Sequence, residues 1–223
     1  MKKLLTVFLF AMIIACQAIG QSNRITKIIP DDYPVKDSMF QGNYGQLVSG
    51  EITSLDQAWF TNDTLKQTLV FDLYTDYHRL EIYHFYNDNI PLELIDEMEL
   101  YVSKGQFNNI FDTATAQQKH SFFKGFLSSG KKISQSYFTT LKGFRLGDKK
   151  EKALGIYGNP DKYSISKGIE KCEWKFEGDY RALESKTKIK TSKPLAKDSW
   201  GFYVKMFFSS NRLMAMILSN DIP

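Results

Sequence analysis

The stretch that decides the fold is Lys142–Phe176. It reads K-G-F-R-L-G-D at 142–148, continues through a short run of helical periodicity to G-N-P-D at 158–161, and ends in C-E-W-K-F at 172–176. Glycine tolerates positive φ angles and proline cannot continue a helix, so both act as boundaries. The stretch therefore predicts one short helix with defined ends, followed by a strand.

The predicted helix has a signal at each end. Asp148 has the chemistry of an N-cap, and Glu151 three residues later completes a capping-box pattern. Gly158 supplies a C′ position in the left-handed region, and Pro160 stops the helix. We expect a helix of about three turns. Its inward-facing stripe consists of Ala153, Leu154 and Tyr157.

Three strands follow the helix. Residues 170–177 alternate strictly, with Cys172, Trp174 and Phe176 on one face and charged residues on the other, which is typical of an antiparallel strand with one wet face. Residues Gly201–Phe208 and Arg212–Leu218 form a second strand pair, and Asn211 is suited to the turn between them. The C-terminal region is thus a helix followed by three strands.

This closing hairpin is apolar on both faces and must be covered on both. The short helix can cover only one of them, so we expect the helix that carries Phe122, Phe123 and Phe126 to cover the other. By simple alternation one face holds Val204, Met206, Phe208, Leu213, Ala215 and Ile217, and the other holds Tyr203, Phe207, Met214, Met216 and Leu218.

The C-terminal pattern resembles the BamE/SmpA-like family of small envelope lipoproteins, over roughly residues 141–219. The resemblance implies helices packed on a three-stranded antiparallel sheet, and a non-enzymatic scaffold role at the outer membrane. The chain departs from the family in showing one clear helix instead of two, and in an insertion from Asp179 to Ser199. The motif residues are Gly143, Gly147, Asp148, Gly158, Pro160, Trp174 and Phe176, the last standing where Tyr is commoner.

The N-terminus has the pattern of a secretory signal. A basic start at residues 1–3 precedes an apolar run from Leu4 to Ile14, and Ala18-Ile19-Gly20 is a small-residue cleavage site. The polar segment before Gly20 favours cleavage there, but Ile13-Ile14-Ala15-Cys16 also fits a lipobox, in which Cys16 is acylated. Both alternatives place the protein outside the cytoplasm, in the periplasm or at the outer-membrane periphery. No other segment is long and apolar enough to be a transmembrane span.

Charge and cysteine content narrow the function classes. Two of the 29 basic residues leave with the signal, so 27 remain against 25 acidic residues, which is no signature of nucleic-acid binding. After cleavage at Gly20 only Cys172 remains, so we expect no intramolecular disulfide.

We expect three parts in the chain: a signal peptide (1–20), an N-terminal α+β region (21–136) and the C-terminal α+β unit (137–223). Arg79-Leu80 and Asn87-Asp88 recur as Arg212-Leu213 and Asn220-Asp221, which suggests a tandem arrangement similar to that of β-lactamase-inhibitor-like proteins. The elements expected in the N-terminal region are an irregular lead-in to about residue 50, a helix at Ser54–Phe60, a hairpin of Leu65–Tyr74 and Arg79–Tyr86, and helices at Pro91–Val102 and Thr115–Leu127.

Candidate metal or acid–base groups do not form a convincing site. His78, Glu81 and His84 lie on one predicted strand, where six residues separate the histidines by about 20 Å and Glu81 points to the other face. We expect His84 to be a hydrogen-bonded core residue. Glu93, Asp96 and Glu97 share a helix face, which we interpret as solvated. We predict no metal and no cofactor.

A run of lysines occupies the insertion from Asp179 to Ser199. It has two interpretations: a solvated hairpin, or weak contact with anionic lipid headgroups or lipopolysaccharide phosphates. The residues are Lys186, Lys188, Lys190, Lys193 and Lys197.

The function predicted from these features is an exported binding or scaffold protein of the cell envelope, with an envelope protein as partner and no catalytic activity. The sequence contains no G-x-S-x-G, H-E-x-x-H or Walker motif. The alternative is an envelope hydrolase, whose nucleophile and base would come from Cys172 and the histidines at 78, 84 and 120. We expect Cys172 to be buried and unreactive instead.

Overall fold

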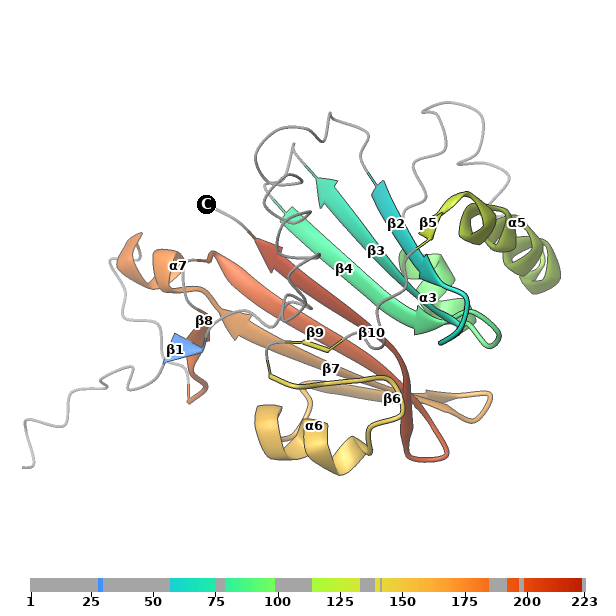
Figure 1. The fold of residues 1–223 in the computed structure, drawn as a ribbon. Coiled ribbons are helices and arrows are strands. Elements are labelled where there is room, and N and C mark those ends of the chain that lie inside the picture. The colour runs from blue at the N-terminus through green and yellow to red at the C-terminus, as the bar shows by residue number, and fades with distance from the viewer. Residues whose placement is uncertain are drawn as a thin grey trace, which may run out of the picture.

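The computed structural model shows an α+β protein, as predicted, and its two regions share one large sheet (Figure 1). The structure describes residues 28–29, 57–74, 79–98, 114–132, 139–140, 142–184, 192–196 and 199–221.

The sheet has eight strands in the order β5-β2-β3-β4-β10-β9-β7-β6. Neighbouring strands are antiparallel except for the parallel pair β5–β2. The strands are β2 (Gln57–Asn62), β3 (Gln67–Tyr74), β4 (Arg79–Tyr86), β5 (Lys131–Lys132), β6 (Lys162–Ser166), β7 (Ile169–Glu177), β9 (Gly201–Ser209) and β10 (Arg212–Asp221). A separate parallel pair is formed by β1 (Ile28–Ile29) and β8 (Leu195–Ala196).

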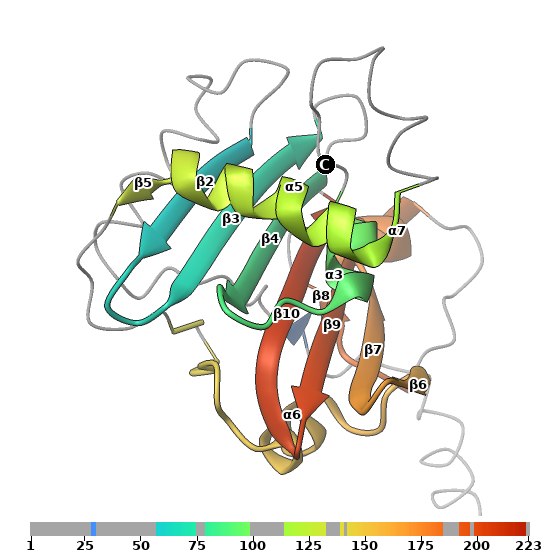
Figure 2. The same ribbon diagram turned by 90° about the vertical axis from the view of Figure 1, so that its right-hand side faces the viewer.

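Helices lie on both faces of the sheet. Figure 2 shows α5 (Ala116–Ser129) crossing β2, β3 and β4, with α3 (Leu92–Glu97) beside it. The helix α6 (Lys150–Tyr157) packs on the opposite face, and the short α7 (Asp179–Glu184) follows β7. The N-terminal and C-terminal regions meet where β4 pairs with β10, in the middle of the sheet.

One buried cluster fills the α6 face. An aromatic group surrounds Tyr157, whose ring centroid lies 5.5 Å from those of Phe144 and Trp174 and 5.7 Å from that of Phe176. The cluster extends across β9, β10 and β4 to Leu69 and other residues of β3. Burying this apolar area is the main source of stability for the fold.

A second cluster fills the opposite face under α3 and α5. Phe123 of α5 contacts Trp59 and Phe85 with ring centroids 5.5 Å apart, and Leu94 and Ile95 of α3 are fully buried. The cluster also contains Phe207, Met214, Ala215 and Ile217 of the closing hairpin. The prediction that the N-terminal region covers the second face of this hairpin is therefore confirmed, but α3, which the prediction did not name, shares this cluster with the expected helix α5.

The glycines and tryptophan of the quoted motif hold α6 against the sheet. Gly158 has a φ of 78°, and its carbonyl oxygen accepts a hydrogen bond from the indole N–H of Trp174 at 2.9 Å. Gly147 has a φ of 88°, and its N–H donates to the carbonyl oxygen of Leu213 in β10 at 2.7 Å. Both ends of the helix are thereby tied to strands.

The predicted capping box is wrong. The helix has Lys149 as its N-cap, without a side-chain cap. Asp148 cannot serve because its carbonyl oxygen is bound by the N–H of Leu213, and its carboxylate accepts from the N–H of Arg145 and from Lys152. Glu151 accepts hydrogen bonds from the Asn211 amide.

The face assignment of β10 is also corrected. The register between β9 and β10 shifts at a β-bulge between Leu213 and Ala215. One extra residue in a strand moves every later side chain to the other face. Met216 and Leu218 therefore join Val204 and Met206 on the α6 face, whereas Ala215 and Ile217 join Phe207 under α3 and α5.

Other elements of the prediction differ from the structure. The sequence predicts a helix over Ser54–Phe60, but residues from Gln57 onward form β2, because Trp59 and Phe60 each bury their rings by pairing with β3. The helix that follows Pro91 ends at Glu97, earlier than Val102. The edge strand β6 is absent from the prediction, so the C-terminal region contributes four sheet strands instead of three.

The remaining N-terminal elements agree with the prediction. The strands β3 and β4 form the expected hairpin, with Phe71 opposite Ile82. The helix α5 begins at a capping box formed by Thr115 and Gln118.

The strand order is mirrored about the β4–β10 pair, with the meander β2-β3-β4 on one side and β7, β9 and β10 on the other. This order is compatible with a tandem repeat, and the duplication itself stays a prediction.

Candidate functional site

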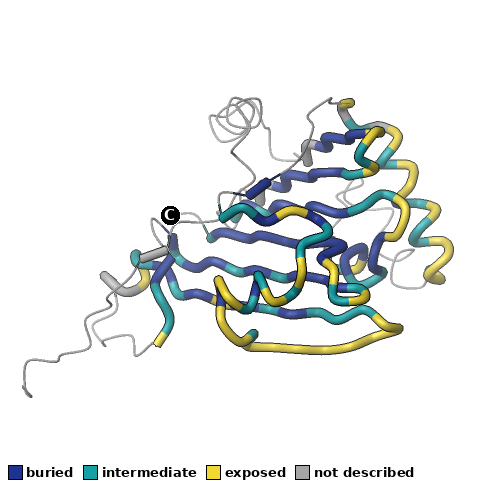
Figure 3. The backbone as a smooth tube through the Cα atoms, turned by 60° about the horizontal axis from the view of Figure 1, so that its bottom comes forward, coloured by how far each residue is buried: buried dark blue, intermediate teal, exposed yellow. Residues whose placement is uncertain are grey.

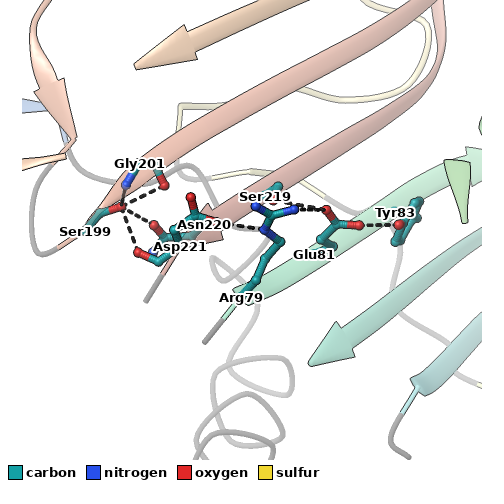
Figure 4. Close-up of polar contacts among 8 residues, drawn as sticks. All are labelled: Arg79, Glu81, Tyr83, Ser199, Gly201, Ser219, Asn220 and Asp221. Atoms are coloured by element: carbon teal, nitrogen blue, oxygen red, sulfur yellow. Dashed lines mark hydrogen bonds and ion pairs between the residues drawn. The ribbon is translucent and has the colours of Figure 1, made fainter. Parts of the chain in front are cut away.

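Polar side chains gather on the α3 face of the sheet, at the end where β4 and β10 meet (Figure 4). Arg79 lies opposite Asp221, and Glu81 lies opposite Ser219. Cross-strand partners stand about 5 Å apart at Cβ and can bond directly. The apolar part of this face, toward the β2–β3 and β9–β10 turns, lies under α3 and α5.

The polar residues are bonded to one another in a chain. Arg79 Nε donates to Asp221 Oδ1 at 2.7 Å, and its guanidinium lies 3.9 Å from Glu81. Glu81 in turn accepts hydrogen bonds from the hydroxyl groups of Ser219, at 3.2 Å, and Tyr83. Beside it, Ser199 bonds to Asn220 and to the backbone of Gly201.

Glu97 continues the ion network across the layers. It stands at the C-terminal end of α3 and forms ion pairs with Lys205 of β9 and with Lys171 of β7, the latter at 3.1 Å. Its side chain is only 22% exposed, so the interpretation of Glu97 as a solvated residue is wrong. Asp96 is more exposed and pairs with Lys119 of α5 at 2.5 Å. The ion pairs of Glu97 hold α3 on the sheet.

A shallow open cleft of about 180 Å³ lies over this network. Its charged groups pair with neighbours, Arg79 with Asp221 and Lys205 with Glu97. Burial and the nearby Asp221 carboxylate raise the pKa of Tyr203. We interpret the cleft as structural. Its lining residues are Arg79, Glu81, Tyr203, Lys205, Ile217 and Ser219.

The candidate nucleophile Cys172 and the candidate base His84 do not meet. They lie in one cross-strand row, but Met206 and Met216 stand between them. Three strand spacings amount to roughly 14 Å, far beyond hydrogen-bond reach. Both side chains are buried, and burial raises the pKa of the Cys172 thiol and lowers that of His84 to about 3. The predicted burial of Cys172 is confirmed.

The other candidate histidines add no catalytic pair. His120 lies on α5, on the opposite face of the sheet from Cys172, and His78 lies outside the described residues. His84 Nε2 is 3.0 Å from Gln67 Oε1, as expected of a hydrogen-bonded core histidine.

Metal, lipid and membrane predictions fall partly outside the described ranges. Within those ranges no group of three or more His, Cys, Asp or Glu side chains could hold a metal ion, and no helix is long and apolar enough to cross a bilayer. Cys16 lies outside them. Of the lysine run only Lys193 is described, and it pairs with Asp161 and donates to the carbonyl oxygen of Lys175 at 3.3 Å. Lys186, Lys188, Lys190 and Lys197 lie outside the described residues.

The edge strand β6 differs from every other part of the described sheet. All five of its residues are exposed, and it appears in yellow at the margin of the buried strands in Figure 3. Tyr163 is 52% exposed and Ile165 is 63% exposed, on the side of the sheet that carries α6. Ile156 of α6 is exposed as well. These three are the large hydrophobic residues exposed among the residues that the structure describes.

The two edges of the sheet are built differently. The edge strand β5 is only two residues long and consists of lysines, a design that discourages pairing with other chains. The edge strand β6 has five residues with alternating apolar side chains, and no other strand of the described part of the chain pairs with its outer side. Sequence reasoning missed β6, although the alternation K-Y-S-I-S between Pro160 and Gly168 is a recognisable strand signal.

Comparison with known proteins gives no further guide. No family model, no curated protein and no solved structure matches the chain.

Proposed function

We propose that this chain is an exported scaffold protein of the cell envelope that binds other polypeptides and does no catalysis. The observation that carries the proposal is the exposed edge strand β6, with Tyr163 and Ile165 on its surface. An exposed sheet edge binds an extended segment through backbone hydrogen bonds, and alternate side chains give the contact its specificity. The proposed docking surface consists of β6 together with Ile156 of α6.

The location in the envelope is proposed from the signal pattern at residues 1–20, with either cleavage after Gly20 or acylation of Cys16. The resemblance to BamE/SmpA-like lipoproteins supports the same compartment and a non-enzymatic role. Weak contact of the lysine run with anionic headgroups remains part of the proposal, although Lys193 itself is engaged by Asp161.

The hydrolase alternative is less well supported. Its nucleophile and its best-described base are buried and separated by two strands, and the polar cleft over β4 and β10 has charged groups that pair with one another. We therefore propose that the docking surface, and not the polar cleft, carries the function.

A photo-crosslinking residue at position 165, introduced in the producing cell, tests this proposal. We expect a covalent adduct with another polypeptide chain in the envelope fraction. The matched control carries the same group at Lys124, an exposed residue of α5 on the opposite side of the sheet, and should give no adduct. Absence of an adduct from position 165, or a cytoplasmic location of the protein, would contradict the proposal.

A further inference from the structure

The sequence around β6 is complementary to itself when read in the opposite direction. It runs Asp161-Lys-Tyr-Ser-Ile-Ser-Lys167, with Ser164 at the centre. In an antiparallel pair of two such strands centred on Ser164, each Tyr163 stands opposite Ile165 of the other copy. Aromatic and β-branched residues form favourable cross-strand pairs.

Neighbouring registers lose these matches. Centring the pair on Tyr163 places Ile165 opposite Asp161, and centring it on Ile165 places Tyr163 opposite Lys167. Of these registers, the one centred on Ser164 alone gives both Tyr163 and Ile165 an apolar partner within the strand. Its two-fold axis, perpendicular to the sheet, also keeps Tyr163 and Ile165 of both copies on the α6 side.

We propose that the strand bound by β6 is β6 of a second copy of this chain, so that two eight-stranded sheets join edge to edge. This inference rests on the proposed function and names the partner of the same docking surface. The contact would be isologous, because each copy contributes the same residues. It would complete the backbone hydrogen bonds of β6 and cover both exposed apolar side chains.

Replacing Ser164 with Cys tests the register directly. Ser164 lies on the axis, so the two new thiols would be about 5 Å apart at Cβ, which is close enough for a disulfide after a small adjustment. We expect the processed protein carrying Ser164→Cys to form a covalent dimer under mild oxidation. Wild-type protein is the control, because it reveals any crosslinking that comes from the buried Cys172, or from Cys16 if that residue is retained.

The matched control is Lys162→Cys on the same face of the same strand. In the proposed register position 162 lies opposite Ser166 of the other copy, and the two introduced thiols are about 13 Å apart along the strands. We expect at least about tenfold less covalent dimer than with Ser164→Cys, because a disulfide needs Cα atoms within about 7 Å. Adding Ile165→Asp to Ser164→Cys should abolish the dimer, and circular dichroism would confirm that this exposed substitution leaves the fold intact.

Equal crosslinking at positions 162 and 164, or a monomer at position 164 under all oxidising conditions, would overturn the inference. The proposed function would still stand in that case if the photo-crosslink from position 165 joined a different envelope protein. If the photo-crosslink joined nothing, the proposed function would fail together with the inference.

Discussion

The phenol of Tyr163 donates a hydrogen bond to Glu170 Oε2 at 2.6 Å, which connects the edge strand β6 to β7. Glu170 is also held by Lys150 of α6 at 2.5 Å. The Tyr163 ring is therefore fixed in orientation while about half of its surface stays exposed. A rigid, exposed aromatic ring loses little conformational entropy on binding, which suits it to anchor a partner strand.

Substituting Gly158 tests whether the end of α6 requires a residue that can adopt a positive φ angle. Its φ of 78° is unfavourable for any residue with a side chain, although nothing stands within 4 Å of the position of an added Cβ. We expect Gly158→Ala to lower the free energy of unfolding by about 1–2 kcal/mol, measured by urea denaturation. The matched control Gly155→Ala, inside the same helix and equally open, should raise it by about 0.5–1 kcal/mol. If both substitutions changed stability in the same direction, this explanation would be wrong.

His84 predicts a specific pH dependence of stability. Burial lowers its pKa in the folded protein to about 3, whereas the unfolded chain has the ordinary value of 6.5. Between these values the unfolded state binds more protons, so stability falls as the pH drops below about 6.5. We expect a loss of about 1.4 kcal/mol between pH 7.5 and pH 5.5 from this residue.

The comparison variant for this pH dependence is His84→Gln, which lacks the titrating group. Between pH 7.5 and pH 5.5 the variant should lose about 1.4 kcal/mol less stability than the wild-type protein. An equal pH dependence in wild type and variant would assign the effect to other groups.

Cys172 is predicted to be unreactive while the protein is folded. Its side chain is buried, and burial raises the pKa of the thiol, so little thiolate is present at neutral pH. A thiol reagent should label it only after denaturant is added, and Cys172→Asp should destabilise by more than about 3 kcal/mol because an unpaired carboxylate would be buried. Rapid labelling of the native protein would refute this prediction.

Glu97 should contribute more to stability than the other acidic residues of α3. Replacing it with Gln removes two ion pairs to β7 and β9, so Lys205 loses this counter-charge, whereas Lys171 keeps Glu173 at 3.0 Å. We expect Glu97→Gln to cost about 1–2 kcal/mol in thermal or urea unfolding. Glu93→Gln on the same helix, with no such cross-layer pairs among the described residues, is the control and should cost less than about 0.5 kcal/mol. Equal costs for the two variants would remove the role assigned to Glu97.

The form of the mature N-terminus is decided by intact mass. Cleavage after Gly20 predicts a chain that begins at Gln21, whereas the lipobox predicts an acylated chain that begins at Cys16. A mass matching neither form would contradict the predicted export signal.

Local features of the fold were predictable from sequence because they depend on neighbouring residues. The helix ending at Gly158, the alternation around Trp174 and the capped helix beginning after Thr115 all have their signals within a few residues. The bulge in β10 gave no such signal, because Leu213 and Met214 are both apolar and fit either face.

The candidate site was less accessible to sequence reasoning. Glu97 meets its two lysines across 74 and 108 residues of chain, so its role depends on the packing of α3 on the sheet. The edge position of β6 likewise follows from the strand order, which sequence periodicity does not specify. That Tyr163 and Ile165 could bind a partner could be inferred only when the structure showed their strand at the edge of the sheet.

Backbone amide exchange in β6 tests the central claim most directly, because the claim is that a second strand completes the outer side of this edge. In the purified, processed protein, we expect protection of the outward-facing amides of β6, those that do not bond to β7, to rise with protein concentration, and to stay low at every concentration in Ile165→Asp. Amides in the central strand β10 should be protected equally in both proteins and at all concentrations. Outward-facing β6 amides that remain unprotected at the highest concentration of the wild-type protein would contradict the account.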